Sequence, residues 1–135
     1  MKILFVASEA VPFAKTGGLA DVAGALPNAL ARLGHEVRLI MPRYRMVGVK
    51  KFHLRKILDR LAVTVGTTSV QVTVFQSTLP QTSVITYFID APAWFDRDGL
   101  YQDQGADFPD NLERFSGFVQ AVLAAVPKLG WTPDV

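Results

Sequence analysis

The chain contains no cysteine, which excludes disulfide bonds and thiolate metal ligands and fits folding in a reducing cytoplasm. It also has no run of the roughly 18 apolar residues that suggests a membrane-spanning helix. A short apolar run at residues 3–7 ends at a serine and a glutamate, too early for the hydrophobic region of a secretory signal. The sequence therefore predicts a cytoplasmic chain without a membrane partner.

Basic and acidic residues nearly balance, so the chain has little net charge. The chain has 14 basic and 12 acidic residues, and a net charge of +2 gives no reason to expect a nucleic-acid or membrane partner. Half of the basic residues lie in residues 43–60: Arg43, Arg45, Lys50, Lys51, Arg55, Lys56 and Arg60. Only Tyr44 and Phe52 interrupt them as stacking aromatics, so a solvated loop is favoured here over a nucleic-acid site.

The first forty residues predict a strand, a helix and a second strand. Residues 3–7 are apolar at every position, which is typical of a parallel strand covered on both faces. From Leu19, apolar residues at 22, 26, 30 and 33 follow helical spacing, with Gly34 as the stop and Pro27 as an expected kink. Val37–Met41 is then a buried strand, joined by a right-handed crossover.

The second half predicts a hairpin, a further strand and a helix. Residues 61–79 alternate apolar and polar around a glycine turn, which indicates a β-hairpin at the sheet margin. The apolar run 84–89 ends at Asp90, at the carboxyl edge where open α/β sheets bind ligands. A last helix is expected from an N-cap at Asp107, with one broad apolar face: Leu112, Phe115, Phe118, Val119, Val122, Leu123 and Val126. The fold class is a Rossmann-like open sheet, mostly parallel.

A long loop over residues 91–107 separates the last strand from the last helix. It carries aromatic and charged residues: Trp94, Phe95, Tyr101, Asp96, Arg97, Asp98 and Asp103. Aromatic rings stack on pyranose faces while charged groups bind hydroxyls, so the mixture suits a sugar. From the residues alone, a small hydrophobic core within the loop is at least as well supported.

The segment from Lys15 to Leu19 joins the first strand to the first helix. Its lysine and its two glycines at a helix start favour a phosphate site, because open backbone N–H groups and the helix dipole attract anions. Neither a Walker loop nor a dinucleotide fingerprint is present, and a solvated Gly-Gly turn is the alternative. His35, alone in a helix-to-strand turn, is expected to be structural rather than a general base.

Residues 2–22 resemble the opening of bacterial glycogen synthases and plant starch synthases. The resemblance recurs in order at residues 87–92, 95–101, 110–115 and 131–135. It implies a GT-B glycosyltransferase of two Rossmann-like domains. Residues 1–135 would be an incomplete N-terminal, acceptor-side domain, and the C-terminal nucleotide-binding domain would be absent.

The resemblance also implies an activity and its residues. The family transfers glucose, with retention, from a nucleotide sugar to the non-reducing end of an α-1,4-glucan, without metal or cofactor. ADP-glucose is the usual donor, with UDP-glucose left open. By position, Lys15 would contact the donor phosphates, Gly17 and Gly18 would offer backbone N–H groups, Asp21 would bind sugar hydroxyls, and Tyr101 would meet the glucan.

The resemblance assigns no catalytic residue within these 135 residues, which are expected to be inactive alone. A non-catalytic module that binds a nucleotide or sugar phosphate is the alternative function. If the N-terminal domain is incomplete, its sheet would expose strand edges, which favours self-association.

Overall fold

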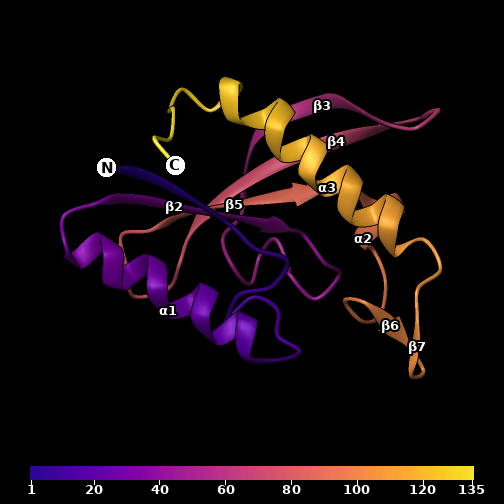
Figure 1. Cartoon of the computed structure of the whole chain (residues 1–135), viewed down its shortest axis with the longest axis horizontal. Coiled ribbons are helices and arrows are strands. Elements are labelled where there is room, and N and C mark those ends of the chain that lie inside the picture. The colour runs from indigo at the N-terminus through magenta and orange to yellow at the C-terminus, as the bar shows by residue number, and fades with distance from the viewer.

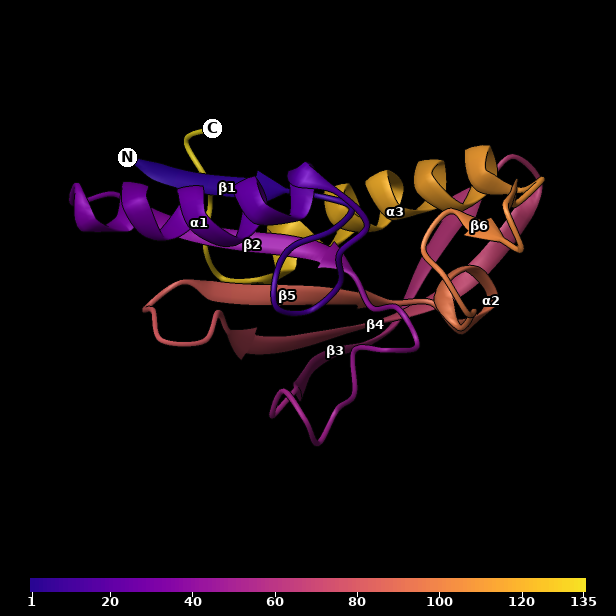
Figure 2. The same ribbon diagram turned by 90° about the horizontal axis from the view of Figure 1, so that it is seen from below.

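The computed structural model describes residues 1–135 and shows a five-stranded sheet with a long helix on each face (Figures 1 and 2). The strands lie in the order β1-β2-β5-β4-β3, and β6 and β7 form a separate two-stranded ribbon. In chain order the elements are β1 (Lys2–Val6), α1 (Gly18–Arg32), β2 (Glu36–Pro42), β3 (Arg55–Val65), β4 (Thr68–Thr78), β5 (Ile85–Asp90), α2 (Pro92–Phe95), β6 (Gln102–Asp103), β7 (Ala106–Asp107), α3 (Asn111–Ala125) and the 3-10 turn η1 (Val126–Lys128).

The sheet combines a parallel half with an antiparallel margin. β2 lies between β1 and β5 and is parallel to both, with Leu4 opposite Arg38 and Ile40 opposite Tyr87. β4 is antiparallel to both β5 and β3, so the β3–β4 hairpin forms one margin. The predicted open α/β sheet with a hairpin at its margin is therefore confirmed.

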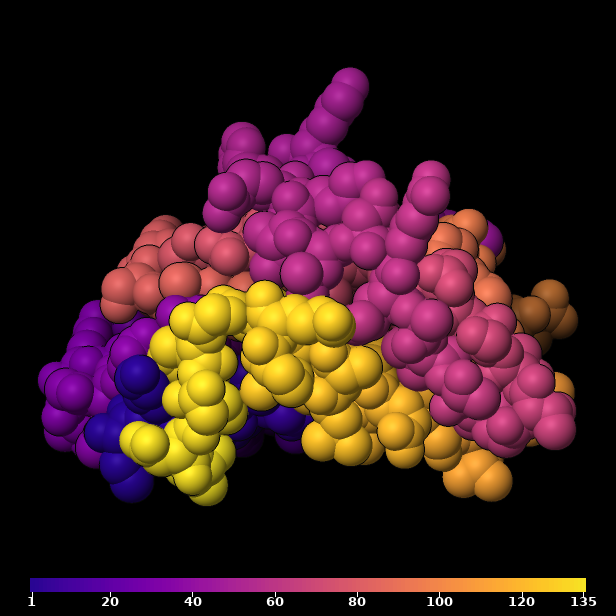
Figure 3. Space-filling model, turned by 90° about the horizontal axis from the view of Figure 1, so that it is seen from above, coloured from indigo at the N-terminus to yellow at the C-terminus, as the bar shows by residue number.

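The two chain ends meet at the other margin. The backbone N–H of Leu4 donates to the carbonyl oxygen of Val135 at 2.8 Å, and that of Asp134 to the carbonyl of Lys2 at 2.7 Å. Figure 3 shows the C-terminal residues against the N-terminal ones, with α3 running beside the β3–β4 hairpin. The outer edge of β1 is thus paired over its first residues. Self-association through a sheet edge stays a prediction.

The turn from α1 to β2 forms as the sequence predicts. Gly34 has a φ of +90°, its N–H donates to Ala31, and the N–H of His35 donates to Leu30, which is the Schellman arrangement that ends a helix. Glycine is required at this position because other residues rarely adopt that backbone conformation. Pro27 lies buried within α1 and does not end it.

The predicted apolar face of α1 is not the buried one. Leu19, Val22, Leu26 and Leu33 are 40–75% exposed, whereas the buried positions are Ala20, Ala23 and Pro27. The helical spacing was correct, but it does not fix which face meets the sheet. Small side chains let the helix backbone approach β2 closely, and the large apolar side chains are left facing outwards.

The basic stretch, residues 43–60, is a loop only in part. β3 begins at Arg55, so the expected loop is wrong over residues 55–60. An edge strand tolerates outward charges, and here Lys56 pairs with Asp59 at 3.0 Å. The pairing with β4 is irregular around Leu58, and Arg60 has a φ of +54°. These irregularities hide the period-two pattern in the sequence.

The last helix starts later than predicted. α3 begins after Asp110, while Asp107 belongs to β7. Leu112, Val119 and Leu123 are exposed, because the helix turns another face to the core: Arg114, Gly117, Phe118, Ala121, Val122 and Ala125. The expectation of one broad apolar face is therefore wrong at those three positions.

The loop at residues 91–107 contains α2 and the β6–β7 ribbon. Trp94 and Phe95 are almost completely buried, so for these two residues the small hydrophobic core is correct and the sugar-binding interpretation is wrong. Gly117 of α3 makes this packing possible. A Cβ atom at that position would lie 2.4 Å from the ring of Trp94.

We expect Gly117→Ala to lower the free energy of unfolding by about 1–3 kcal/mol, since overpacking a rigid aromatic contact forces side chains off their rotamers. Urea unfolding of this chain measures the effect. Gln120→Ala, on the exposed side of the same helix, is the control and is expected to change little. Equal stability of the two variants would contradict the close contact with Trp94.

Arg97 ties the loop to the start of α3 and gives a pH prediction. It donates to both carboxylate oxygens of Asp110, one at 2.7 Å, and this lowers the pKa of Asp110. The ion pair stabilises the fold fully above the unfolded-state pKa of about 3.9, and its contribution is lost as pH falls through the lower folded-state value.

Asp110→Asn should therefore show a shallower loss of unfolding free energy below about pH 4 than the unmodified chain. Asp103→Asn, an exposed residue outside the ion pairs, is the control. Denaturant titrations at a series of acidic pH values measure both slopes. The same acid slope in D110N and the unmodified chain would refute the assignment.

Candidate functional site

The segment between β1 and α1 folds back on itself and is anchored by one aromatic side chain. Phe13 is buried, with the rings of Phe52 and Phe88 each 4.9 Å away in edge-on contact. The segment leaves the carboxyl end of β1, as ligand loops of parallel sheets do. Residues 15–18 follow this anchor and lie at the surface.

Lys15 and Asp21 lie together at the start of α1. The Nζ atom of Lys15 is 2.8 Å from both carboxylate oxygens of Asp21. Their side chains are 50% and 56% exposed, so the ion pair faces solvent. The structure thus brings together two of the five residues that the sequence predicted for substrate binding.

Gly17 and Gly18 leave open space at the helix start. A Cβ atom at either position would meet nothing within 4 Å, and the backbone of Gly17 is extended, a conformation that any residue adopts. No contact within this chain requires glycine at these positions. Their open N–H groups at the positive end of α1 are suited to the close approach of an anion.

Tyr101 reaches the same region from the distant loop. Its hydroxyl lies 2.7 Å from Oγ of Ser8, just after β1. A cavity of about 270 Å³ is lined by Tyr101 and Thr16, together with Gly99, Leu100 and Gln102. The lysine–glycine loop and the predicted acceptor residue therefore border one hollow.

The phenol of Tyr101 is kept protonated. Burial raises its pKa, the charge of Glu9 adds to this, and the hydrogen bond with Ser8 opposes it. Burial also raises the pKa of Tyr44, whose hydroxyl donates to the carbonyl of Ser8 at 2.7 Å. Both groups remain neutral hydrogen-bonding partners at neutral pH.

Arg114 supports the loop that carries Tyr101, a role that was not predicted from the sequence. It is fully buried and donates to the carbonyls of Trp94 at 2.6 Å and Leu100 at 3.0 Å. Burial lowers its pKa, and the rings of Phe95, Phe108 and Phe115 surround the guanidinium. The one available signal was an arginine between the apolar positions of a predicted helix.

Three other carboxylates of this edge, Asp90, Asp96 and Asp98, are already paired. Asp90 accepts a hydrogen bond from Arg43 at 3.0 Å, and Arg45 contacts Asp96 at 2.8 Å and Asp98 at 2.9 Å. These ion pairs also neutralise two of the cations in the basic stretch. They compete with the sugar-binding role considered for Asp96 and Asp98.

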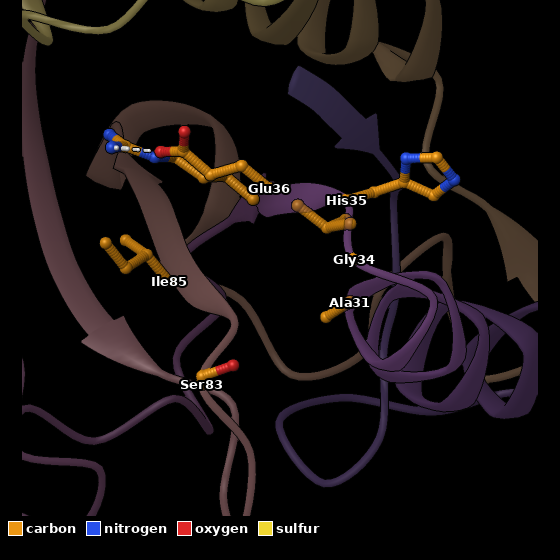
Figure 4. A pocket seen from close by; sticks show the side chains of 8 residues that line it. Ala31, Gly34, His35, Glu36, Ser83 and Ile85 are labelled. Carbon is orange, nitrogen blue, oxygen red and sulfur yellow. Dashed lines mark hydrogen bonds and ion pairs between the residues drawn. The ribbon is translucent and has the colours of Figure 1, made fainter. Parts of the chain in front are cut away.

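His35 lies far from this edge. It borders a cavity of about 350 Å³ at the amino ends of the strands, together with Ala31, Glu36 and Ser83, and Figure 4 shows its ring turned away from the hollow. Its Nδ1 atom is 3.4 Å from the N-terminal amine. This place supports the structural interpretation of His35.

In residues 1–135, no group of three or more histidine, aspartate or glutamate side chains is arranged to hold a metal ion. None of the helices combines the length and apolar character needed to cross a membrane.

Comparison with known proteins finds relatives that are glycogen synthases. Glycogen synthase of Syntrophotalea carbinolica is 48% identical over all 135 residues, and that of Photobacterium profundum is 43% identical over the same length. The chain spans 28% and 26% of these two proteins. It therefore corresponds to about a quarter of their length.

A solved structure agrees with the fold. The catalytic domain of Starch Synthase IV from Arabidopsis thaliana, bound to ADP and acarbose, superposes with a TM-score of 0.82 at 29% identity, covering 98% of this chain and 26% of that one. The sequence profile of the starch synthase catalytic domain, glycosyltransferase family 5, matches residues 2–135. The chain thus belongs to the starch synthase catalytic domain family, of which it carries the N-terminal part.

Proposed function

We propose that this chain contributes the acceptor-side, N-terminal domain of a retaining glucosyltransferase that moves glucose from ADP-glucose to the non-reducing end of an α-1,4-glucan. The observation that carries the proposal is the open Gly17-Gly18 backbone beside Lys15, next to the cavity that Tyr101 borders. The glycogen synthases among its relatives and the ADP and acarbose bound to the Arabidopsis enzyme support the choice of donor and acceptor.

Lys15 acts on the leaving group in this proposal. Breaking the bond between glucose and phosphate builds negative charge on the nucleoside diphosphate, and fixed cations and N–H donors stabilise that charge. Lys15 exchanges Asp21 for the diphosphate. The N–H groups of Gly17 and Gly18 donate further hydrogen bonds to the same diphosphate. Asp21, released from the ion pair, is then able to accept hydrogen bonds from sugar hydroxyls.

Tyr101 meets the glucan acceptor. Its ring is only partly buried and its hydroxyl is protonated, so it offers an apolar face and a hydrogen-bonding group together. The cavity that Tyr101 shares with Thr16 supports acceptor contacts beside the phosphate loop, residues 15–18. Transfer requires such nearness because the acceptor hydroxyl must reach the anomeric carbon.

The proposal assigns nucleotide binding to a C-terminal domain outside these residues. With only about a quarter of the relatives' length, residues 1–135 are expected to transfer no glucose by themselves. Tests of activity therefore require a full-length synthase that carries this segment. A protein of that length that binds the nucleotide sugar without transferring glucose would support the non-catalytic module instead.

In such a full-length synthase, Lys15→Ala should lower the turnover number with ADP-glucose by about 10²–10³, the usual effect of removing one preorganised donor. Its thermal unfolding midpoint should change little, since an exposed ion pair contributes only about 0–1 kcal/mol. Lys50→Ala, another exposed lysine, is the control. An unchanged turnover number in K15A would rule out the role of Lys15.

Tyr101→Ala should raise the KM for maltoheptaose by roughly tenfold, because an aromatic contact contributes about 0.5–1.5 kcal/mol beyond its buried area. The KM for ADP-glucose should stay the same. Tyr101→Phe keeps the ring but loses the hydroxyl that contacts Ser8, so it is expected to raise this KM less than Tyr101→Ala does. A selective rise in the KM for the donor would show that Tyr101 does not serve the acceptor.

A further inference from the structure

Glu9 is a buried carboxylate that the proposed chemistry does not use. It follows β1 closely, is only 3% exposed, and takes part in none of the ion pairs of the chain. Lys15, its closest cation along the chain, pairs with Asp21 instead. A buried charge without a cation opposes folding unless hydrogen bonds offset its lost hydration.

The hydrogen bonds of Glu9 go to the phosphate loop. Its Oε2 atom accepts from the backbone N–H of Thr16 at 2.6 Å and from the Thr16 hydroxyl at 2.8 Å. Thr16 itself is exposed, and the two glycines after it have nothing packed around their Cα atoms. Two contacts therefore restrain this part of the loop: Glu9 on Thr16 and Asp21 on Lys15.

The contact of Asp21 with Lys15 and the contact of Glu9 with Thr16 differ in exposure and in whether they involve a proposed ligand-binding group. The exposed pair of Lys15 and Asp21 must open before Lys15 can reach a phosphate. The hydrogen bonds of the buried Glu9 to Thr16 do not involve the proposed ligand-binding atoms. They keep Gly17 and Gly18 in place while Lys15 changes partner.

Ser8, the neighbour of Glu9, makes a corresponding contact with Tyr101, which borders the cavity. Its Oγ atom lies 2.7 Å from the hydroxyl of Tyr101, and its carbonyl accepts from the buried Tyr44 at 2.7 Å. Ser8 is thus fixed to the core from one side and holds Tyr101 from the other. Two adjacent residues reach two loops whose positions are far apart in the sequence.

We propose that Ser8 and Glu9 are a pair of positioning residues: Glu9 sets the phosphate loop for the donor, and Ser8 sets Tyr101 for the glucan acceptor. The assignment of the two sides rests on the proposed function. The two holding contacts are independent of it. The consequence is that each residue affects one substrate and not the other.

The test uses a full-length synthase that carries this segment and compares steady-state kinetics of single variants. Glu9→Ala should lower kcat/KM for ADP-glucose by about 10²-fold, the effect of misplacing a reacting group by about 1 Å, with the KM for maltoheptaose unchanged. Ser8→Ala should raise the KM for maltoheptaose by roughly two- to tenfold, the effect of one neutral hydrogen bond, with the KM for ADP-glucose unchanged.

Glu9→Gln separates position from charge. The amide oxygen has two lone pairs and can accept both bonds from Thr16, so E9Q should stay within about threefold of the unmodified enzyme. A loss in E9Q as large as in E9A, or equal effects of E9A and S8A on both substrates, would overturn the proposal. Either result would show a general loss of structure or a role for the charge itself.

A second measurement needs no activity. Amide hydrogen exchange, followed by mass spectrometry in the same proteins, should speed up at residues 15–18 in Glu9→Ala and stay unchanged there in Ser8→Ala and Glu9→Gln. Unchanged exchange in E9A would overturn the proposal whatever the kinetics. Faster exchange in E9A, in a protein that transfers no glucose, would support the holding contact while the proposed function fails.

Discussion

The insertion of Phe13 between Phe52 and Phe88 is the contact on which the site depends. A loop that binds a ligand must leave its backbone open, and an open backbone gains little from packing of its own. Burial of one aromatic side chain contributes roughly 1.5–3 kcal/mol and fixes the loop on the sheet. Residues 15–18 can then remain exposed without being displaced from the end of β1.

Local patterns in the sequence were sufficient for much of the fold and for the location of the loop. Continuous apolar runs identified β1, β2 and β5 as strands. β2 and β5 are mostly buried, as strands covered on both faces are, whereas β1 is an edge strand with partly exposed residues, so for β1 the expected covered, central position is wrong. The glycine after α1 marked its end, since few other residues adopt a positive φ. Lys15, Gly17 and Gly18 could be predicted as an anion site because that chemistry at a helix start is local in sequence.

Other features depend on tertiary packing and were not visible in the sequence. The spacing of Val22 and Leu26 fits a helix, but small residues elsewhere on α1 decide which face meets the sheet. Trp94 could not be assigned to core or ligand until Gly117 was placed against its ring. Ser8 and Arg114 contact segments distant in the chain, so their roles follow only from the contacts. The bond from Glu9 to Thr16 is local, but no sequence pattern marks it. Tyr101 was predicted by resemblance, and nothing local distinguishes it from its buried aromatic neighbours.

The ion pairs at this edge differ in how readily they can be exchanged. Arg43 and Asp90 are less than a quarter exposed, whereas the side chains of Lys15 and Asp21 are half exposed. An exposed pair contributes about 0–1 kcal/mol, so the proposed exchange of Asp21 for a phosphate, which forms stronger charge-assisted hydrogen bonds, costs Lys15 little. Breaking a partly buried pair costs more, because each charge loses its partner where water reaches it less easily. Lys15, the cation beside the open glycines, is therefore in a pair that can be exchanged at lower cost than the pair of Arg43 and Asp90.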